Sequence, residues 1–199
     1  MGFIEELKEK ARKNRKKIVL PEGMDKRTYE AAEQIIKEDF ADIIILATDE
    51  ELETYGSGYN IEGATIINPL NYEKTKEYAE GFYELRKAKG MTQPQALAMV
   101  VSDHMYFACM MVKCGDADGV VSGACHSSAN TLRPSLQIIK TKPGSKLVSA
   151  FFVVCVKNKD MGANGVFVMG DCGLNQNPNP TQLADIAASS AESFEYLVG

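Results

Sequence analysis

The sequence predicts an α/β protein, with a three-layer parallel-sheet domain followed by an incomplete second α/β domain. Short apolar runs of strand length alternate along most of the chain with segments whose apolar residues recur at helical spacing. The composition of the 199 residues, 45% hydrophobic and 25% charged, is ordinary for a globular α/β protein. We therefore expect right-handed crossovers between parallel strands, with ligands at the carboxyl ends of the strands.

The first α/β domain is predicted at residues 1–143. Helix starts are marked by a capping residue, Asp25, and by two capping boxes, Thr48 with Glu51 and Thr92 with Gln95. The expected strands are 18–20, 43–47, 64–67 and 120–121; the expected helices run from residue 3, from residue 25, from residue 48, over 72–89, and through the largely apolar stretch 99–114.

The start of a second α/β domain is predicted at residues 144–199, after a seam of Lys, Pro, Gly and Ser at 142–145. A β-branched and aromatic strand over 147–156 and a second strand over 166–169 are spaced to pair as a hairpin. Thr181 is expected to cap a last helix. Two strands and one helix bury too little surface for a complete domain, so this domain is expected to be truncated.

Charge and targeting signals narrow the class of protein. The formal charge is −5, which disfavours binding to nucleic acid or to an anionic membrane. The N-terminus has no apolar stretch typical of a signal peptide, and no segment approaches the ~20 apolar residues of a membrane span. We expect a cytoplasmic protein. The 5 cysteines include no C-x-x-C pair, which favours reduced thiols over disulfides or structural zinc.

Residues 115–144 carry the pattern of an anion-binding site. A tight turn leads into a short apolar strand, then into a loop of small residues and hydroxyls, then into a helix with Arg133 near its start. Small residues let the backbone approach a ligand, the first N–H groups of a helix lack internal partners, and a guanidinium matches phosphate or carboxylate oxygens. The sequence therefore predicts an anion pocket at this strand-to-helix junction.

The same stretch contains residues typical of two other kinds of site, a Ser/His triad and a calcium loop. His126 lies beside Ser127, but adjacent residues rarely meet side chain to side chain, so a Ser/His triad is not predicted. Asp116 and Asp118 resemble the opening of a calcium loop, but the positions that follow lack oxygen donors. We therefore interpret them as part of a turn, and no metal site is predicted.

Three segments together resemble phosphate acetyltransferase, also called phosphotransacetylase, of the phosphate acetyl/butyryltransferase family. They are IVLPEGMDKRTYEAAEQI, YFACMMVKCGDADGVVSGACHSSANTLRPSLQIIKTKPG and GDCGLNQNPNPTQLADIAASSAES. The resemblance implies reversible acetyl transfer between acetyl-CoA and phosphate, giving acetyl phosphate and coenzyme A. It also implies a cytoplasmic homodimer of two-domain α/β subunits, with coenzyme A and acetyl-CoA as substrates and no permanently bound cofactor.

The resemblance also assigns site residues. Ser127, Ser128, Thr131 and Arg133 would hold the phosphate of acetyl phosphate, and Arg86 would meet a phosphate of coenzyme A. This chain has Ser128 where the family often has Thr, which keeps a hydroxyl. On the residues alone, Arg86 belongs to a basic cluster at a helix end, where cations interact favourably with the last carbonyls.

Length is the main departure from the family pattern. Family members continue past the equivalent of Gly199, and the catalytic Arg and Asp of the family lie in that later segment. The resemblance thus implies an N-terminal portion with impaired activity alone. The alternatives are a catalytically inactive anion- or coenzyme A-binding or assembly fragment, a phosphate butyryltransferase, and a decarboxylating dehydrogenase-like fold. The last is disfavoured because the chain has no G-x-G-x-x-G loop and no metal-binding acid cluster.

Overall fold

A computed structural model of the chain describes residues 2–145 and 147–199. These residues divide into two compact units, Lys10–Lys140 and a smaller unit that joins Thr141–Gly199 with the N-terminal residues up to Glu9. The domain boundary predicted after residue 143 stays a prediction.

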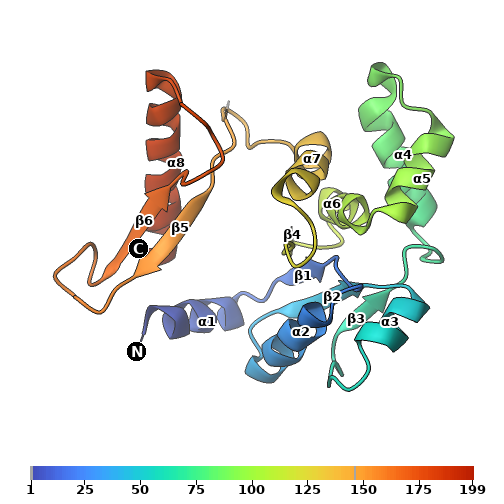
Figure 1. Cartoon of the computed structure of the whole chain (residues 1–199), viewed down its shortest axis with the longest axis horizontal. Coiled ribbons are helices and arrows are strands. Elements are labelled where there is room, and N and C mark those ends of the chain that lie inside the picture. The colour runs from blue at the N-terminus through green and yellow to red at the C-terminus, as the bar shows by residue number, and fades with distance from the viewer. Residues whose placement is uncertain (1, 146) are drawn as a thin grey trace. The chain divides into compact units, whose positions relative to one another are not determined.

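The larger unit is built on a four-stranded parallel sheet with the strand order β3-β2-β1-β4 (Figure 1). Ile18 of the central strand β1 lies opposite Ile43 of β2 and Gly119 of β4. The chain moves outward from β1 to β3 and then returns to the other side of β1, so the topological switch point lies between β1 and β4. The strands are β1 (Lys17–Leu20), β2 (Asp42–Leu46), β3 (Thr65–Ile67) and β4 (Gly119–Val120).

Helices connect these strands, and the capping residues predicted in this unit form their hydrogen bonds. Asp25 caps the second helix, and both capping boxes, Thr48 with Glu51 and Thr92 with Gln95, are closed. The helical elements are α1 (Phe3–Lys13), α2 (Lys26–Glu38), α3 (Asp49–Tyr55), α4 (Thr75–Arg86), the 3-10 turn η1 (Lys87–Lys89), α5 (Gln93–Ser102), α6 (His104–Cys114) and α7 (Ser128–Ile138).

The sheet separates two hydrophobic cores. Ile43 and Ile45 of β2 pack into a core shared with α2, whereas Ile44 and Leu46 pack into a larger core formed with α4, α5, α6 and α7. Alternate residues of a strand point to opposite faces, so this division confirms the α/β sandwich of sheet and helices that the sequence predicts (Figure 1).

The smaller unit contains an antiparallel hairpin, β5 (Phe151–Cys155) and β6 (Val166–Gly170), and the helix α8 (Pro180–Val198). The first strand was predicted to begin at residue 147, and this is wrong. Phe151 pairs with Gly170, the last residue of β6, so no partner strand remains for the preceding residues. The predicted cap of α8 is also wrong. Asn179 forms the capping box, because Pro180 fills the first helical position.

Among residues 2–145 and 147–199, no single helix has the length and apolar composition of a membrane span. The helices α5 and α6 meet that test only as a pair, and the pair is bent by 104°.

Candidate functional site

The loop between β1 and α2 is held rigidly at the carboxyl edge of the sheet. The Nδ1 atom of the buried His104 lies 3.2 Å from the carbonyl oxygen of Pro21. The hydroxyl of Thr28 donates to the Glu22 carbonyl at 2.8 Å, and that of Tyr29 donates to the Gly23 carbonyl at 2.8 Å. Three successive carbonyls of this loop are therefore fixed, and with them the direction of the Glu22 side chain.

The Glu22 carboxylate occupies the centre of the loop that follows β4. One oxygen accepts the backbone N–H groups of Gly123 and Ala124 at 2.9 and 2.8 Å, and the other accepts those of Cys125 and His126, both at 2.8 Å. Successive N–H groups that point to one side form a concavity suited to an anion. The amide-lined part of the predicted anion pocket is thus filled by a carboxylate of the chain itself, with only 3% of Glu22 exposed.

Glu22 is ionised in this setting. Burial by itself would raise the pKa of the carboxyl group, but the N–H groups of Cys125, His126 and Ala124 and the His126 ring lower it to about 2. The carboxylate can therefore only accept hydrogen bonds at neutral pH.

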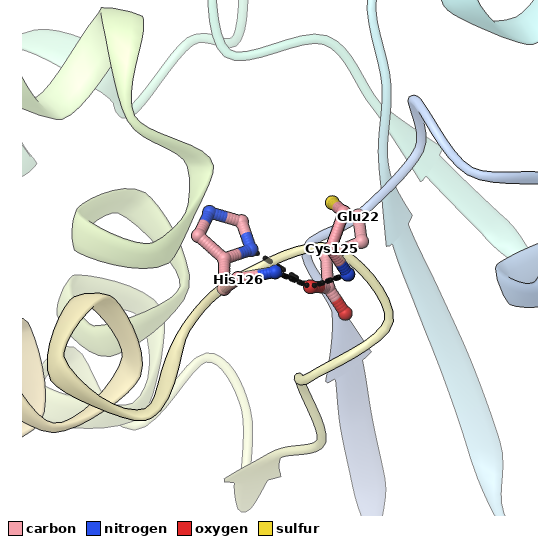
Figure 2. Close-up of side chains that lie close together, drawn as sticks. All are labelled: Glu22, Cys125 and His126. Carbon is pink, nitrogen blue, oxygen red and sulfur yellow. Dashed lines mark hydrogen bonds and ion pairs between the residues drawn. The ribbon is translucent and has the colours of Figure 1, made fainter.

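The His126 ring completes the shell around Glu22. Its Nδ1 atom lies 2.8 Å from the carboxylate oxygen that also accepts the N–H groups of Cys125 and His126, and Figure 2 shows the other ring nitrogen on the far side of the ring. Because an ionised carboxylate has no proton to give, Nδ1 must carry the hydrogen of this bond. The Nε2 atom makes no hydrogen bond to the residues that the structure describes.

The ligand-type atoms of Glu22, Cys125 and His126 lie within 4.8 Å of one another, a spacing that a metal ion would also accept. The hydrogen bonds decide against that use. Both carboxylate oxygens already accept N–H donors, and Nδ1 of His126 is itself a donor toward Glu22. A cation would have to displace this shell, so the cluster fits an internal anion held by donors.

A second group holds the same loop from its carbonyl side. Arg27, in the first turn of α2, donates to the carbonyl oxygen of Ala124 and forms a bidentate pair with Asp25. The Arg27 hydrogen bonds lower the pKa of Asp25 to about 2. The segment from Glu22 to Arg27 thus binds both the N–H groups and a carbonyl of the loop that leads into α7.

The predicted phosphate ligands lie together on the first two turns of α7. Ser127 caps the helix and accepts the N–H of Asn130 at 3.3 Å, and the Thr131 hydroxyl donates to the Ser127 carbonyl at 3.3 Å. Ser128 and Arg133 are exposed, and within the described part of the chain neither side chain has a hydrogen-bond or ion-pair partner. The N–H groups of the first turn also lack intrahelical partners, as at any helix start.

Arg133 lies in the middle of α7, whereas the sequence suggested a position near the start of a helix. Pro134 follows it within α7 and is buried. A proline at this depth removes one intrahelical N–H, which leaves the carbonyl of Asn130 without its usual donor. The helix still starts at Ser128 because the Ser127 side chain caps it.

Arg86 and Arg133 converge on one buried tyrosine. Tyr106 is 5% exposed, and its hydroxyl donates to Gln137 of α7 at 3.3 Å. Burial and Asp103 raise the pKa of Tyr106, while the positive charges of Arg133 and Arg86 both oppose that rise. The Nε atom of Arg86 is buried and has no partner among the described residues. Two arginines that lie 47 positions apart in the sequence thus act electrostatically on the same side chain.

Asp116 and Asp118, which resemble the opening of a calcium loop in the sequence, have another role in the structure. Asp116 accepts from the hydroxyl of Tyr78 at 2.6 Å and pairs with Lys74, and Asp118 accepts the backbone N–H of Lys17 at 2.9 Å. Both carboxylates therefore hold neighbouring elements in place, in agreement with the interpretation as a turn.

Sequence reasoning missed Glu22, Arg27 and the contact between Glu22 and His126. The sequence contains one signal for the contact between Glu22 and the loop after β4. Glu22 directly follows a central strand, and a loop of small residues follows β4. In a sheet whose switch point lies between these strands, the two loops must meet. The strand order, however, is not visible in the sequence.

Comparison with known proteins gives a consistent result. The sequence model of the family described as phosphate acetyl/butaryl transferase matches residues 2–199. A phosphate acetyltransferase from Thermoanaerobacterium thermosaccharolyticum is 49% identical over 199 residues, which is 100% of this chain and 60% of the relative. One from Acetivibrio thermocellus is 48% identical over the same shares.

Solved structures agree with these sequence matches. A phosphotransacetylase from Streptococcus pyogenes superposes with a TM-score of 0.88 at 38% identity, covering 99% of this chain and 59% of that one. The chain thus spans about 60% of the length of the curated relatives it matches.

Proposed function

The chain belongs to the phosphate acetyl/butaryl transferase family, and from that membership we propose that it carries the phosphate-binding part of a phosphate acetyltransferase. In the reaction, the thiolate sulfur of coenzyme A bonds to the carbonyl carbon of acetyl phosphate after its proton passes to a base. The bond from that carbon to the phosphate oxygen then breaks, and phosphate leaves with the electron pair. The reverse direction consumes acetyl-CoA and phosphate.

One observation supports this proposal most directly: the first two turns of α7 carry a cation and several donors that have no partner among the residues the structure describes. Arg133 contributes a guanidinium, Ser128 contributes a hydroxyl, and the helix start contributes N–H groups. Ser127 accepts a hydrogen bond through its oxygen, so its own proton remains free to donate. Thr131 would exchange its intrahelical bond for one to a phosphate oxygen.

Arg86 is proposed to bind a phosphate group of coenzyme A. Its buried Nε atom lacks a partner among the described residues, and a charged donor left unpaired in this way is costly. A phosphate oxygen would satisfy it.

Further properties that the resemblance implies belong to the same proposal. Coenzyme A and acetyl-CoA act as substrates, the protein works as a homodimer, and it is cytoplasmic. Light scattering on purified protein tests the dimer. The relatives described above are named acetyltransferases, which favours acetyl over butyryl phosphate as the substrate. No catalytic residue is assigned among residues 1–199.

The deciding experiment measures phosphate-dependent release of coenzyme A from acetyl-CoA by the purified chain and by Arg133→Ala, with the exposed Lys113→Ala as control. Loss of one charge-assisted contact should weaken phosphate binding roughly 10- to 100-fold, since such contacts are worth ~1.5–3 kcal/mol. The proposal is supported if Arg133→Ala loses turnover while Lys113→Ala keeps it. A wild-type chain that binds coenzyme A without turnover would favour the inactive binding fragment, and one that binds neither ligand would contradict the assignment.

A further inference from the structure

The carboxylate of Glu22 has no function in the mechanism described above, yet it is among the most extensively hydrogen-bonded side chains of the molecule. It is 3% exposed and accepts the N–H groups of Gly123, Ala124, Cys125 and His126 together with the His126 ring. All of these partners precede Ser127 directly. Glu22 therefore touches the backbone that leads into the proposed phosphate ligands, but none of those ligands themselves.

We propose that Glu22 is a positioning residue for the phosphate site: it is an internal anion around which the loop Gly123–His126 closes, and it fixes the His126 ring with hydrogen on Nδ1. The proposal rests on the proposed function, because the site that Glu22 positions is the phosphate site on α7.

The loop geometry requires an anion at this place. Four consecutive N–H groups pointing inward would lose their hydrogen bonds to water on burial, and a neutral side chain cannot accept from all of them. The carboxylate of Glu22 does so with four bonds of 2.8–2.9 Å. Since this concavity is filled from within, the substrate phosphate is directed to the next donors along the chain, those of Ser127, Ser128 and Arg133.

The anchoring of Glu22 makes this arrangement stiff. The carbonyls of Pro21, Glu22 and Gly23 are each hydrogen-bonded to a side chain of α2 or α6. On the loop side, Arg27 holds the Ala124 carbonyl. These contacts fix the position of Ser127, and hence the start of α7, relative to the central strand β1. The hydroxyls and Arg133 are therefore already in position when the substrate binds.

The His126 ring gives the proposal a signature that a purely structural carboxylate would not have. With Nδ1–H bonded to an ionised Glu22, the neutral ring can only be the Nδ1–H tautomer, and Nε2 is the atom left to contact a ligand or water. The other charged or titratable groups near this pair are Arg27, Asp25 and the Cys125 thiol.

The test uses the whole chain with Glu22→Gln, and with Glu53→Gln as the matched control, because Glu53 is an exposed glutamate on α3. Glutamine keeps the shape but offers one oxygen to donors that need two, and its NH₂ group faces N–H groups. Titration with inorganic phosphate by calorimetry should show at least a 10-fold weaker dissociation constant for Glu22→Gln and an unchanged one for Glu53→Gln. Binding of coenzyme A should change less than twofold.

Nitrogen NMR of His126 provides a second measurement that needs no ligand. The Nδ1–H tautomer is expected in the wild-type chain, and this result can be read without a variant. Where Glu22→Gln folds, its spectrum should shift toward a tautomer mixture. An Nε2–H tautomer in wild type overturns the proposal, and so does wild-type phosphate affinity in Glu22→Gln.

A failure of the proposed function gives a different pattern from a failure of the positioning role. A wild-type chain that binds no phosphate contradicts the proposed function, and the His126 spectrum then still decides whether Glu22 fixes the ring. If Glu22→Gln does not fold, the wild-type spectrum decides in the same way. Equal weakening of phosphate and coenzyme A binding would indicate a general structural role and would overturn the positioning proposal.

Discussion

The hydroxyl of Tyr78 on α4 donates a 2.6 Å hydrogen bond to Oδ2 of Asp116, in the turn between α6 and β4. The same carboxylate pairs with Lys74 at the start of α4. This contact joins the helix that ends in Arg86 to the turn that delivers β4 and the loop Gly123–His126. It therefore connects the two halves of the proposed site through buried structure.

We expect Tyr78→Phe to lower the free energy of unfolding by about 1–3 kcal/mol, because a buried hydrogen bond to a charged group is lost while the ring stays packed. Tyr78 is fully buried, and burial together with the bond to Asp116 raises its pKa. Urea unfolding measures the change. Tyr55→Phe is the control, since Tyr55 is partly exposed and its hydroxyl has no hydrogen bond among the described residues. Equal effects of the two variants would contradict the role given to this bond.

Glu22 should make the chain sensitive to acid. Its pKa is lowered from an ordinary 4.5 to about 2, so its contribution is complete above pH 4.5 and is lost as the pH falls toward 2. At about 1.4 kcal/mol per pKa unit, the contribution is on the order of 3 kcal/mol. Urea unfolding at pH 6 and at pH 3 should show that Glu22→Gln loses less stability on acidification than wild type does.

The pKa values of other carboxylates are lowered as well, that of Asp25 to about 2 by Arg27 and that of Asp116 by its bonds to Lys74 and Tyr78, so the difference between variant and wild type is the quantity to follow. Glu53→Gln should keep the wild-type pH dependence. A Glu22→Gln chain whose stability falls with pH as steeply as that of wild type would show that the carboxylate does not hold the loop.

Gly23 is predicted to tolerate no side chain. A Cβ atom there would lie 2.3 Å from the carbonyl oxygen of Leu46 and 2.6 Å from the Cβ of Ala47. Leu46 is the last residue of β2 and Ala47 follows it directly, so neither can yield without disturbing the sheet. Gly23→Ala should therefore cost at least about 3 kcal/mol or prevent folding, as overpacking against backbone does. Gly173→Ala, where a Cβ meets nothing within 4 Å, should leave the thermal midpoint within about 1 °C of wild type. A stable Gly23→Ala chain would mean that the β1–α2 loop can shift away from β2.

The sequence predicted features that depend on neighbouring residues, and it missed features that depend on contacts between residues far apart in the chain. Caps and strand runs are local, so Asp25, the Thr48 and Glu51 box and the alternation of strands and helices were predicted correctly. The strand expected from residue 147 failed because its length is set by a partner strand that ends at Gly170. The bonds from Glu22 to the loop Gly123–His126 span more than 100 positions and require the strand order, which no local pattern contains.

The candidate site shows the same difference between local features, which the sequence predicts, and long-range contacts, which it does not. The hydroxyls of α7 and Arg133 could be proposed as ligands from the sequence because they are close in sequence and their chemistry is evident. The sequence suggested that Arg133 lies near the start of a helix, whereas the cap provided by Ser127 starts α7 well before it. The joint electrostatic effect of Arg86 and Arg133 on Tyr106 depends on the packing of α4, α6 and α7 in the larger core, which no local sequence pattern contains.

The Cys125 thiol should react slowly despite its exposed position. Burial of the sulfur and the negative charge of Glu22 raise its pKa from 9.0 to about 11, and the thiolate is the reactive form. At pH 8 the thiolate fraction is then roughly 100-fold smaller than for an ordinary thiol, so alkylation by iodoacetamide should slow by a similar factor. Peptide mapping by mass spectrometry separates Cys125 from the other cysteines, and the urea-unfolded chain gives its unperturbed rate. Glu22→Gln should accelerate the reaction because it removes the charge beside the sulfur. A Cys125 that reacts in the folded chain as fast as in the unfolded chain would contradict the close contact between Glu22 and this loop.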